Sequence, residues 1–209
     1  MRISDDRYGR DLRKYNLARR LIEHEARTRT ICSWSGLPEK RVRSLYQSYI
    51  SPRNGGSVTR HRGPSPQRLG FFMRTAHMRS EAAALAGLCC LLEVVPPRPL
   101  EHARRELPSV ARGERLCAVF EIYCSLLPGT DVTLEHVAML VVALAQGTEL
   151  KLGKCVNCGV VIVVDRYGAT RRACTHCSRE KDDGSVAHNT GLPPDAGHSV
   201  PADRQPRLF

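Results

Sequence analysis

Apolar side chains recur at helical spacing through residues 1–50. A stripe of this kind covers one face of residues 10–25, and a second helical pattern runs over residues 28–49 with an interruption at Gly36. The stripe on the first segment is formed by Leu12, Tyr15, Ala18, Leu21 and Ile22. The second pattern stops at Ser51, because a residue that precedes proline disfavours the helical backbone conformation. We therefore predict an amphipathic helix followed by a helical hairpin.

Three further helical patterns fill the middle of the chain. The first is an apolar run over residues 69–92, and the second covers residues 113–127. Pro128 and Gly129 interrupt the pattern, which resumes over residues 134–144. We predict that these segments form a helical core spanning residues 69–147.

Short apolar runs replace the helical spacing after Gly147. The segments LKLGKC and VVIVVD are alternating or rich in β-branched residues, which predicts two small strands. We expect these strands to belong to a small module in residues 148–179. Residues 180–209 carry few apolar side chains, so ordering them would cost more conformational entropy than burial returns. We predict that this tail is disordered.

Two cysteine pairs in the predicted module have the spacing of a metal site. Two residues separate Cys155 from Cys158, and two separate Cys174 from Cys177. Two such turns offer four thiolates to one tetrahedral ion, and Gly159 suits the first turn because glycine readily adopts positive φ. We therefore predict one structural zinc ion on these cysteines. Four thiolates leave no coordination position for water, so the metal is not expected to be catalytic.

The nine cysteines also have alternative roles that the sequence must distinguish. The number is odd and the N-terminus is charged where a signal peptide needs an apolar stretch, which argues against disulfides and predicts a cytoplasmic protein. An iron–sulfur cluster also uses four cysteines, but zinc is favoured. His176 is an alternative ligand, although four thiolates already close the shell. The remaining cysteines are interpreted as small buried side chains: Cys32, Cys89, Cys90, Cys117 and Cys124.

Positive charge is concentrated on the N-terminal side of the chain. The net charge is +11, and residues 1–80 hold 18 Lys and Arg against 6 Asp and Glu, whereas the rest of the chain holds 14 against 15. Such a region attracts a polyanion such as nucleic acid, although a solubilising surface has the same composition. Residues 51–68 are predicted to be an exposed basic loop, either a linker or an arm along phosphates. Its candidate DNA contacts are Arg53, Arg60 and Arg62.

The hairpin in residues 28–49 has the arrangement of a helix-turn-helix. Gly36 provides the turn, and the small Cys32 lies where the two helices would touch. The side chains predicted to face the core are Ile31, Leu37, Val42 and Leu45. The side chains predicted to face outward, toward base edges and phosphates, are Lys40, Arg41, Arg43, Ser44 and Gln47. Ser35 occupies a position that is commonly apolar and Pro38 replaces the usual hydroxyl cap, so an ordinary helical hairpin with a charged face is the alternative.

The chain resembles the FlhC family, the larger subunit of the flagellar master transcription regulator FlhDC. The resemblance covers most of residues 10–180. It rests on the GLPEKRVRSLYQSY helix, the Gly/Pro-rich loop leading to PSPQRLGFFMRT, the LKLGKCVNCG segment at the start of the metal site and the ACTHC segment that closes it. The four-cysteine spacing is its most specific part. The sequence differs in its Arg-rich loop, its extended N-terminus and its tail.

The resemblance implies a fold that is mostly α, with a helix-turn-helix-like hairpin and a small C-terminal four-cysteine zinc-ribbon-like module. It also implies assembly with FlhD into a heterohexamer that binds promoter DNA. The predicted function is therefore that of a non-enzymatic activator subunit, which binds promoters, recruits RNA polymerase and activates flagellar genes. In that family zinc binds the four cysteines that correspond here to Cys155, Cys158, Cys174 and Cys177.

Two other classes share features with this sequence. An RNA-binding or ribosome-associated zinc-ribbon protein would also be basic and carry four cysteines, but the turn at Gly36 favours DNA binding. A zinc deaminase needs three protein ligands, an open coordination position and a glutamate beside a ligand in an H-x-E triplet. No such triplet occurs in the chain.

Overall fold

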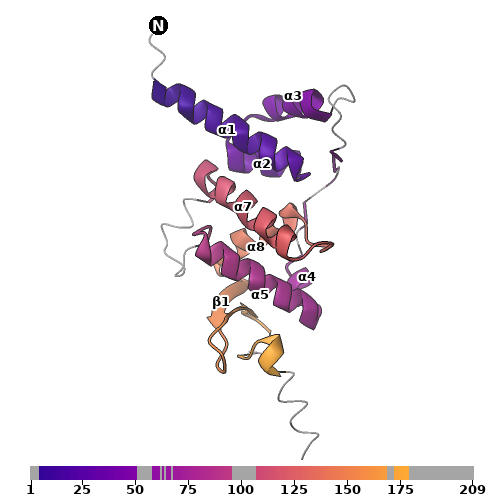
Figure 1. Ribbon diagram of the computed structural model, residues 1–209, viewed down its shortest axis with the longest axis vertical. Helices are drawn as coiled ribbons and strands as arrows, with labels where there is room; N and C mark the ends of the chain where they lie inside the picture. Colours follow the sequence, from indigo (N-terminus) through magenta and orange to yellow (C-terminus); the bar gives the residue numbers. More distant parts are fainter. Residues whose placement is uncertain are drawn as a thin grey trace, which may run out of the picture.

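The computed structural model describes residues 5–50, 58–61, 63, 65–66, 68–95, 107–168 and 172–178. The described part is mostly helical, as predicted, and ends in a small two-stranded sheet beside the cysteine cluster (Figure 1). The helices are α1 (Asp5–Glu23), α2 (Thr28–Ser35), α3 (Glu39–Ile50), α4 (Gly70–Met73), α5 (Ala76–Leu91), α7 (Val110–Leu126) and α8 (Leu134–Gln146). None of these helices combines the length and apolar character that a membrane span requires.

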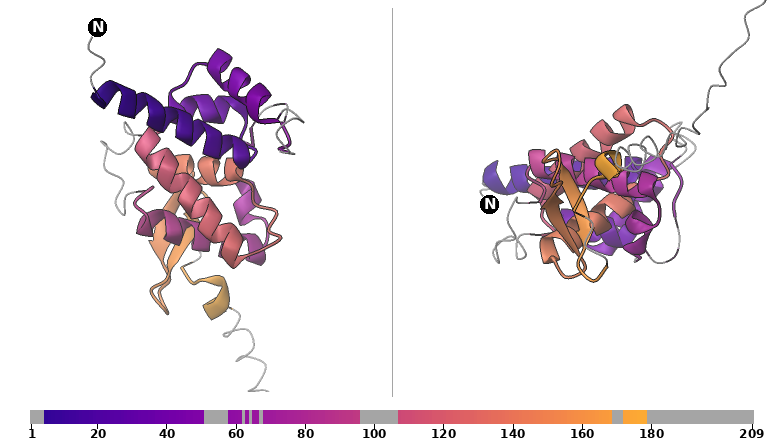
Figure 2. Two further views of the ribbon diagram at one scale, coloured as in Figure 1. Left: turned by 45° about the horizontal axis from the view of Figure 1, so that its top comes forward. Right: turned by 90° about the horizontal axis from the view of Figure 1, so that it is seen from below.

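Helix α1 packs by the C-terminal part of its apolar stripe. Ala18, Leu21 and Ile22 are buried as predicted, and Leu17 is buried beside them. Leu12, in contrast, is 46% exposed, although it belongs to the same apolar stripe. The N-terminal end of α1 projects beyond the start of α7 (Figures 1 and 2). The N-terminal part of the apolar stripe is therefore not fully covered by neighbouring helices, whereas its C-terminal part is buried in the core.

The turn between α2 and α3 follows the prediction for a helix-turn-helix. Gly36 adopts φ 70° and donates its N–H to the carbonyl of Cys32, which ends α2. Ser35 is completely buried, although an apolar residue is common there, because its hydroxyl donates to the Ile31 carbonyl at 2.6 Å and accepts from the Leu37 N–H at 3.2 Å. A buried polar group that is fully hydrogen-bonded carries little penalty. Serine thus takes part in closing the turn.

The predicted continuous helix over residues 69–92 is divided into α4 and α5. Thr75 has an extended backbone, φ −124° and ψ 162°, and its hydroxyl oxygen accepts the N–H of Met78. A threonine N-cap satisfies a backbone donor at the start of a helix, which favours a new helix start over continuation. The apolar periodicity continues across this break, which explains why the pattern alone did not locate it.

The core lies between α1, α2, α5, α7 and α8, and the sheet closes one end of it. Strands β1 (Leu150–Lys154) and β2 (Val161–Asp165) are antiparallel, with Leu150 opposite Asp165 and Lys154 opposite Val161. Strand β2 packs on α5, and Leu150 is part of the same buried cluster as the helices. The cysteine-bearing hairpin is therefore anchored to the helical core through its strands.

Candidate metal centre and nucleic-acid interface

Four cysteine sulfurs gather at the tip of the β1–β2 hairpin and the short segment 172–178. The Sγ atoms of Cys155, Cys158, Cys174 and Cys177 all lie within 4.8 Å of one another. Cys158 Sγ and Cys174 Sγ are 3.7 Å apart. Tetrahedral coordination with metal–sulfur bonds of about 2.3 Å separates the sulfurs by about 3.8 Å. The arrangement therefore fits a single tetrahedral ion.

Backbone hydrogen bonds shape the two cysteine turns. Gly159 adopts φ 73° and donates its N–H to the Cys155 carbonyl, while the Cys155 N–H is bonded to the carbonyl of Val160. The second turn is joined to the first by the Cys174 N–H, which points at Cys155 Sγ at 3.2 Å. These bonds are of the kind that orient metal ligands. The prediction that Gly159 would allow a left-handed turn is confirmed.

Hydrogen bonds within the cluster shift the pKa values of two of its thiols in opposite directions. Backbone N–H groups of Cys158 and then Cys174 lower the pKa of Cys155 to about 6. Side-chain hydrogen bonds with Cys174 and then Cys158 raise the pKa of Cys177 to about 12. Several thiolates cannot be ionised so close together without a neutralising charge. A divalent cation supplies that charge, which matches the chemistry of this donor set.

Little apolar surface is buried around the cysteine turns. Val156 and Val160 are exposed, and Tyr167 is 79% exposed. Lys154 and Arg172 are exposed near the cluster, and His176 is exposed and not part of it, whereas Arg171 lies outside the described residues. The described residues around the cysteines therefore form no hydrophobic core of their own.

The other cysteines lie elsewhere. Cys89 and Cys117 are fully buried, and burial raises the pKa of both thiols to about 12. Cys32, Cys90 and Cys124 are partly buried. The prediction that these cysteines are buried is therefore confirmed for Cys89 and Cys117, whereas the other three are only partly buried.

Helix α3 separates its residues into a buried and an exposed face. Val42 and Tyr46 are buried, Leu45 is partly buried, and Ile31 and Leu37 are buried on the adjoining elements. All five outward residues predicted from the sequence are exposed: Lys40, Arg41, Arg43, Ser44 and Gln47. Tyr46 was not predicted as a core residue, and its hydroxyl donates to the carbonyl of Ala26. This bond fixes α3 against the end of α1 and sets its exposed face outward.

The basic side chains of the α3 surface differ in their surroundings. Arg43 is paired with Glu39 one turn earlier at 2.5 Å, in an exposed ion pair. Arg60, from the loop after α3, lies over the ring of Tyr46 at 5.4 Å. Arg60 therefore contacts α3 through Tyr46, a residue of its buried face, and not through the exposed residues predicted to meet DNA. The other two loop candidates, Arg53 and Arg62, and the tail 180–209 lie outside the described residues.

One important residue was missed by the sequence analysis. Glu135, at the start of α8, is only 7% exposed and accepts the Arg27 N–H at 2.8 Å and the Thr30 hydroxyl at 2.9 Å. Arg27 occupies the N-cap position of α2 and provides no side-chain cap. A carboxylate distant in sequence therefore caps the first helix of the helix-turn-helix. In the sequence, the only sign of this contact is that Arg27 cannot cap α2 with its own side chain. That absence does not show that Glu135 provides the cap.

No protein-family model matches this chain, and no curated protein matches it.

Proposed function

We propose that this chain is a zinc-containing, DNA-binding subunit of a transcriptional activator, which acts with FlhD at flagellar promoters and contacts RNA polymerase. The observation that carries the proposal is the exposed basic and polar face of α3 in a helix-turn-helix arrangement. In such motifs the N-terminal turns of the second helix enter the major groove. Lys40, Arg41 and Ser44 lie in these turns. The FlhD and polymerase partners rest on the family resemblance.

The face of α3 has the chemistry that base and phosphate contacts require. Arg41 and Gln47 carry side chains that form paired hydrogen bonds with guanine and adenine edges, and Lys40 suits a phosphate. Arg43 would exchange its exposed bond with Glu39 for a phosphate at small cost, because exposed ion pairs contribute little free energy. Arg60 would add charge beside Tyr46. We assign DNA contact first to the residues on α3.

We propose zinc as the ion held by the four cysteines. The short sulfur–sulfur separations favour one ion over a cluster, because bridging sulfides would hold the thiolates further apart. Its role is structural, since four thiolates complete the coordination shell.

An RNA-binding function is the second candidate. The hairpin beside the cysteines carries the exposed Tyr167 together with Lys151, Lys154 and Arg166. Exposed aromatic rings beside basic groups stack on unpaired bases. This surface lies at the opposite end of the molecule from α3 (Figure 1).

A competition experiment distinguishes the two candidates. The zinc-loaded chain, alone and with FlhD, is titrated against a labelled flagellar promoter duplex and against a hairpin RNA of equal length. We expect the duplex to bind at least about tenfold more tightly, with an affinity that falls steeply as salt rises, because contacts to phosphates release counterions. Tighter binding to the RNA would favour the second candidate and contradict the first.

A further inference from the structure

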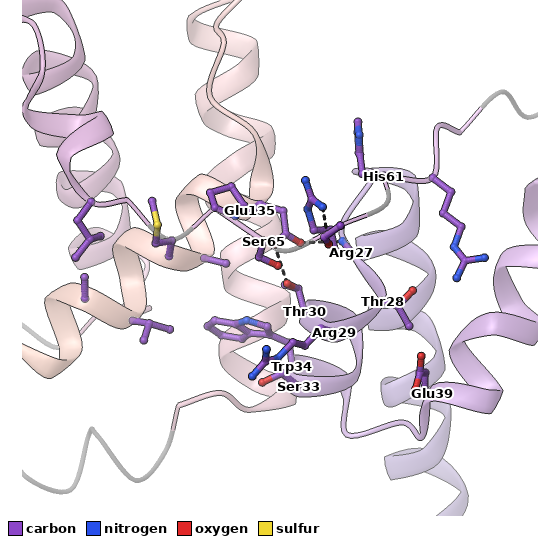
Figure 3. Close-up of a pocket in the computed structure, with 18 of the residues that line it drawn as sticks. Arg27, Thr28, Arg29, Thr30, Ser33, Trp34, Glu39, His61, Ser65 and Glu135 are labelled. Carbon is purple, nitrogen blue, oxygen red and sulfur yellow. Dashed lines mark hydrogen bonds between the residues drawn. The ribbon is translucent and has the colours of Figure 1, made fainter.

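A cavity of about 920 Å³ lies between the helix-turn-helix and the helical core. Its walls come from α2, the described residues of the segment after α3, and the middle of α8 (Figure 3). Cavities of 300 to 1,000 Å³, as a rough range, accommodate small organic ligands in proteins. The metal centre lies outside this space, whereas Glu39 of α3 and the DNA candidate Arg60 line its edge.

One side of the cavity is apolar. Its apolar lining consists of Trp34, Leu69, Ala138, Met139, Val142 and Ala143. Trp34 is 3% exposed, so the indole forms part of the wall and does not project into solvent. A ligand that fits here must carry an apolar chain or ring.

The polar side of the cavity favours a negative charge. Its two carboxylates are already engaged: Glu39 accepts from Arg43, and Glu135 accepts from Arg27 N–H and the Thr30 hydroxyl. Arg29 is exposed on the same wall, and no hydrogen bond or ion pair of its side chain occurs within the described residues. An exposed guanidinium without a partner suits a carboxylate.

Hydrogen bonds hold the wall formed by the segment after α3. Glu25 accepts the Thr59 N–H at 3.1 Å and is bonded to the His61 ring at 2.9 Å. Arg27 donates to the Gly63 carbonyl at 2.8 Å (Figure 3). Because these bonds fix the wall against α2, the cavity is formed without a ligand. A small molecule can bind to a preformed cavity without the free-energy cost of opening it.

We propose that this cavity binds an amphipathic anion, a carboxylate on a medium-length apolar chain, with the head group at Arg29 and the chain against Trp34, Met139 and Val142. This ligand site is separate from the metal centre, and its proposed ligand contacts, Arg29, Trp34, Met139 and Val142, are not among the proposed DNA contacts. A ligand in it would contact α2 and α8 together, and would stabilise their present arrangement in proportion to its occupancy.

The test uses Trp34, which is the single tryptophan of the chain, as the reporter. The full zinc-loaded protein is titrated with decanoate, with decanol as the uncharged analogue and with acetate as the head group alone. We expect a saturable change in tryptophan emission with decanoate, at a concentration about tenfold lower than for decanol, and no change with acetate. Equilibrium dialysis with labelled decanoate measures the same dissociation constant without fluorescence.

Variants locate the site. Arg29→Gln should weaken decanoate binding about tenfold while leaving decanol binding unchanged, because only the charge-assisted contact is lost. Val142→Phe should abolish binding by filling the cavity. The matched control Arg74→Gln removes an exposed arginine outside the cavity and should bind as the native protein does.

The proposal is overturned if decanoate gives no saturable change, or if Arg29→Gln binds decanoate with native affinity. Should Val142→Phe fail to fold, Arg29→Gln alone decides. No DNA is present in these measurements, so a negative result leaves the proposed DNA-binding function untouched, and the reverse also holds.

Discussion

Replacing Cys155 and Cys158 together by alanine is expected to reduce bound zinc from one ion per chain to none and to unfold the segments that carry the cysteines. The reason is the composition of these segments. Val156, Val160 and Tyr167 are exposed, so burial contributes little to holding the two turns together. The few bonds between them, such as Val156 N–H to the Arg172 carbonyl, do not replace a core. We therefore expect metal coordination to supply the stability, as in other small zinc-binding folds with four cysteines.

The loss should be local. Strand β2 packs on α5 and strand β1 on α8, and Leu150 belongs to the main core, so the helices should remain folded. The measurement is zinc content by mass spectrometry together with hydrogen exchange, which should accelerate in residues 155–160 and 172–178 and stay unchanged in α7 and α8. The matched control is Cys90→Ala with Cys124→Ala, which removes two thiols outside the cluster and should retain the zinc. A Cys155/Cys158 variant that still holds one zinc ion per chain would contradict the assignment.

Replacing Glu135 by alanine is expected to lower the free energy of unfolding by about 2–4 kcal/mol. The carboxylate is buried and bonds both the Arg27 N–H and the Thr30 hydroxyl, so its removal leaves two donors at the start of α2 unsatisfied. It also removes a negative charge from a helix N-terminus, where such a charge is stabilising. Glu135→Gln should be intermediate, because the amide retains one acceptor oxygen but turns an N–H₂ group toward the second donor.

Glu93→Ala is the matched control. Glu93 also pairs with an arginine, Arg115, but its side chain is 75% exposed. Exposed pairs contribute about 0–1 kcal/mol, so this variant should unfold almost as the native protein does. Urea denaturation followed by Trp34 emission and by circular dichroism measures both variants. Equal stability of Glu135→Ala and Glu93→Ala would refute the role of Glu135 as the cap of α2.

The features that the sequence predicted correctly depend on neighbours along the chain. Helical spacing located α7 and α8, and Gly36 and Gly159 marked positions where positive φ is needed. The cysteine spacing identified the sulfur cluster, because each pair is set by one short turn. In each case the deciding interactions lie within a few residues.

The features that were missed depend on contacts between distant segments or on competition between local signals. Leu12 belongs to a regular apolar stripe, but whether α7 covers it depends on where the two helices are placed. Glu135 caps α2 from a helix more than a hundred positions away. At Thr75 the N-cap of α5 starts a new helix although the apolar pattern continues without a break. The cavity arises in the same way, since three segments separated in sequence form its walls.

The central claim, that α3 reads DNA, is tested most directly by comparing two double variants of equal charge. Lys40→Ala with Arg41→Ala removes two exposed cations from α3, whereas Arg7→Ala with Arg10→Ala removes two exposed cations from α1. The affinity of each zinc-loaded protein, together with FlhD, for a flagellar promoter duplex is measured by fluorescence anisotropy over a range of salt concentrations. We predict that the α3 variant loses affinity about 100-fold and that its salt slope falls by about one per lost phosphate contact, while the α1 variant keeps nearly native affinity. Equal losses of affinity in both variants would mean that binding depends only on the net charge of the protein, and would contradict recognition through α3.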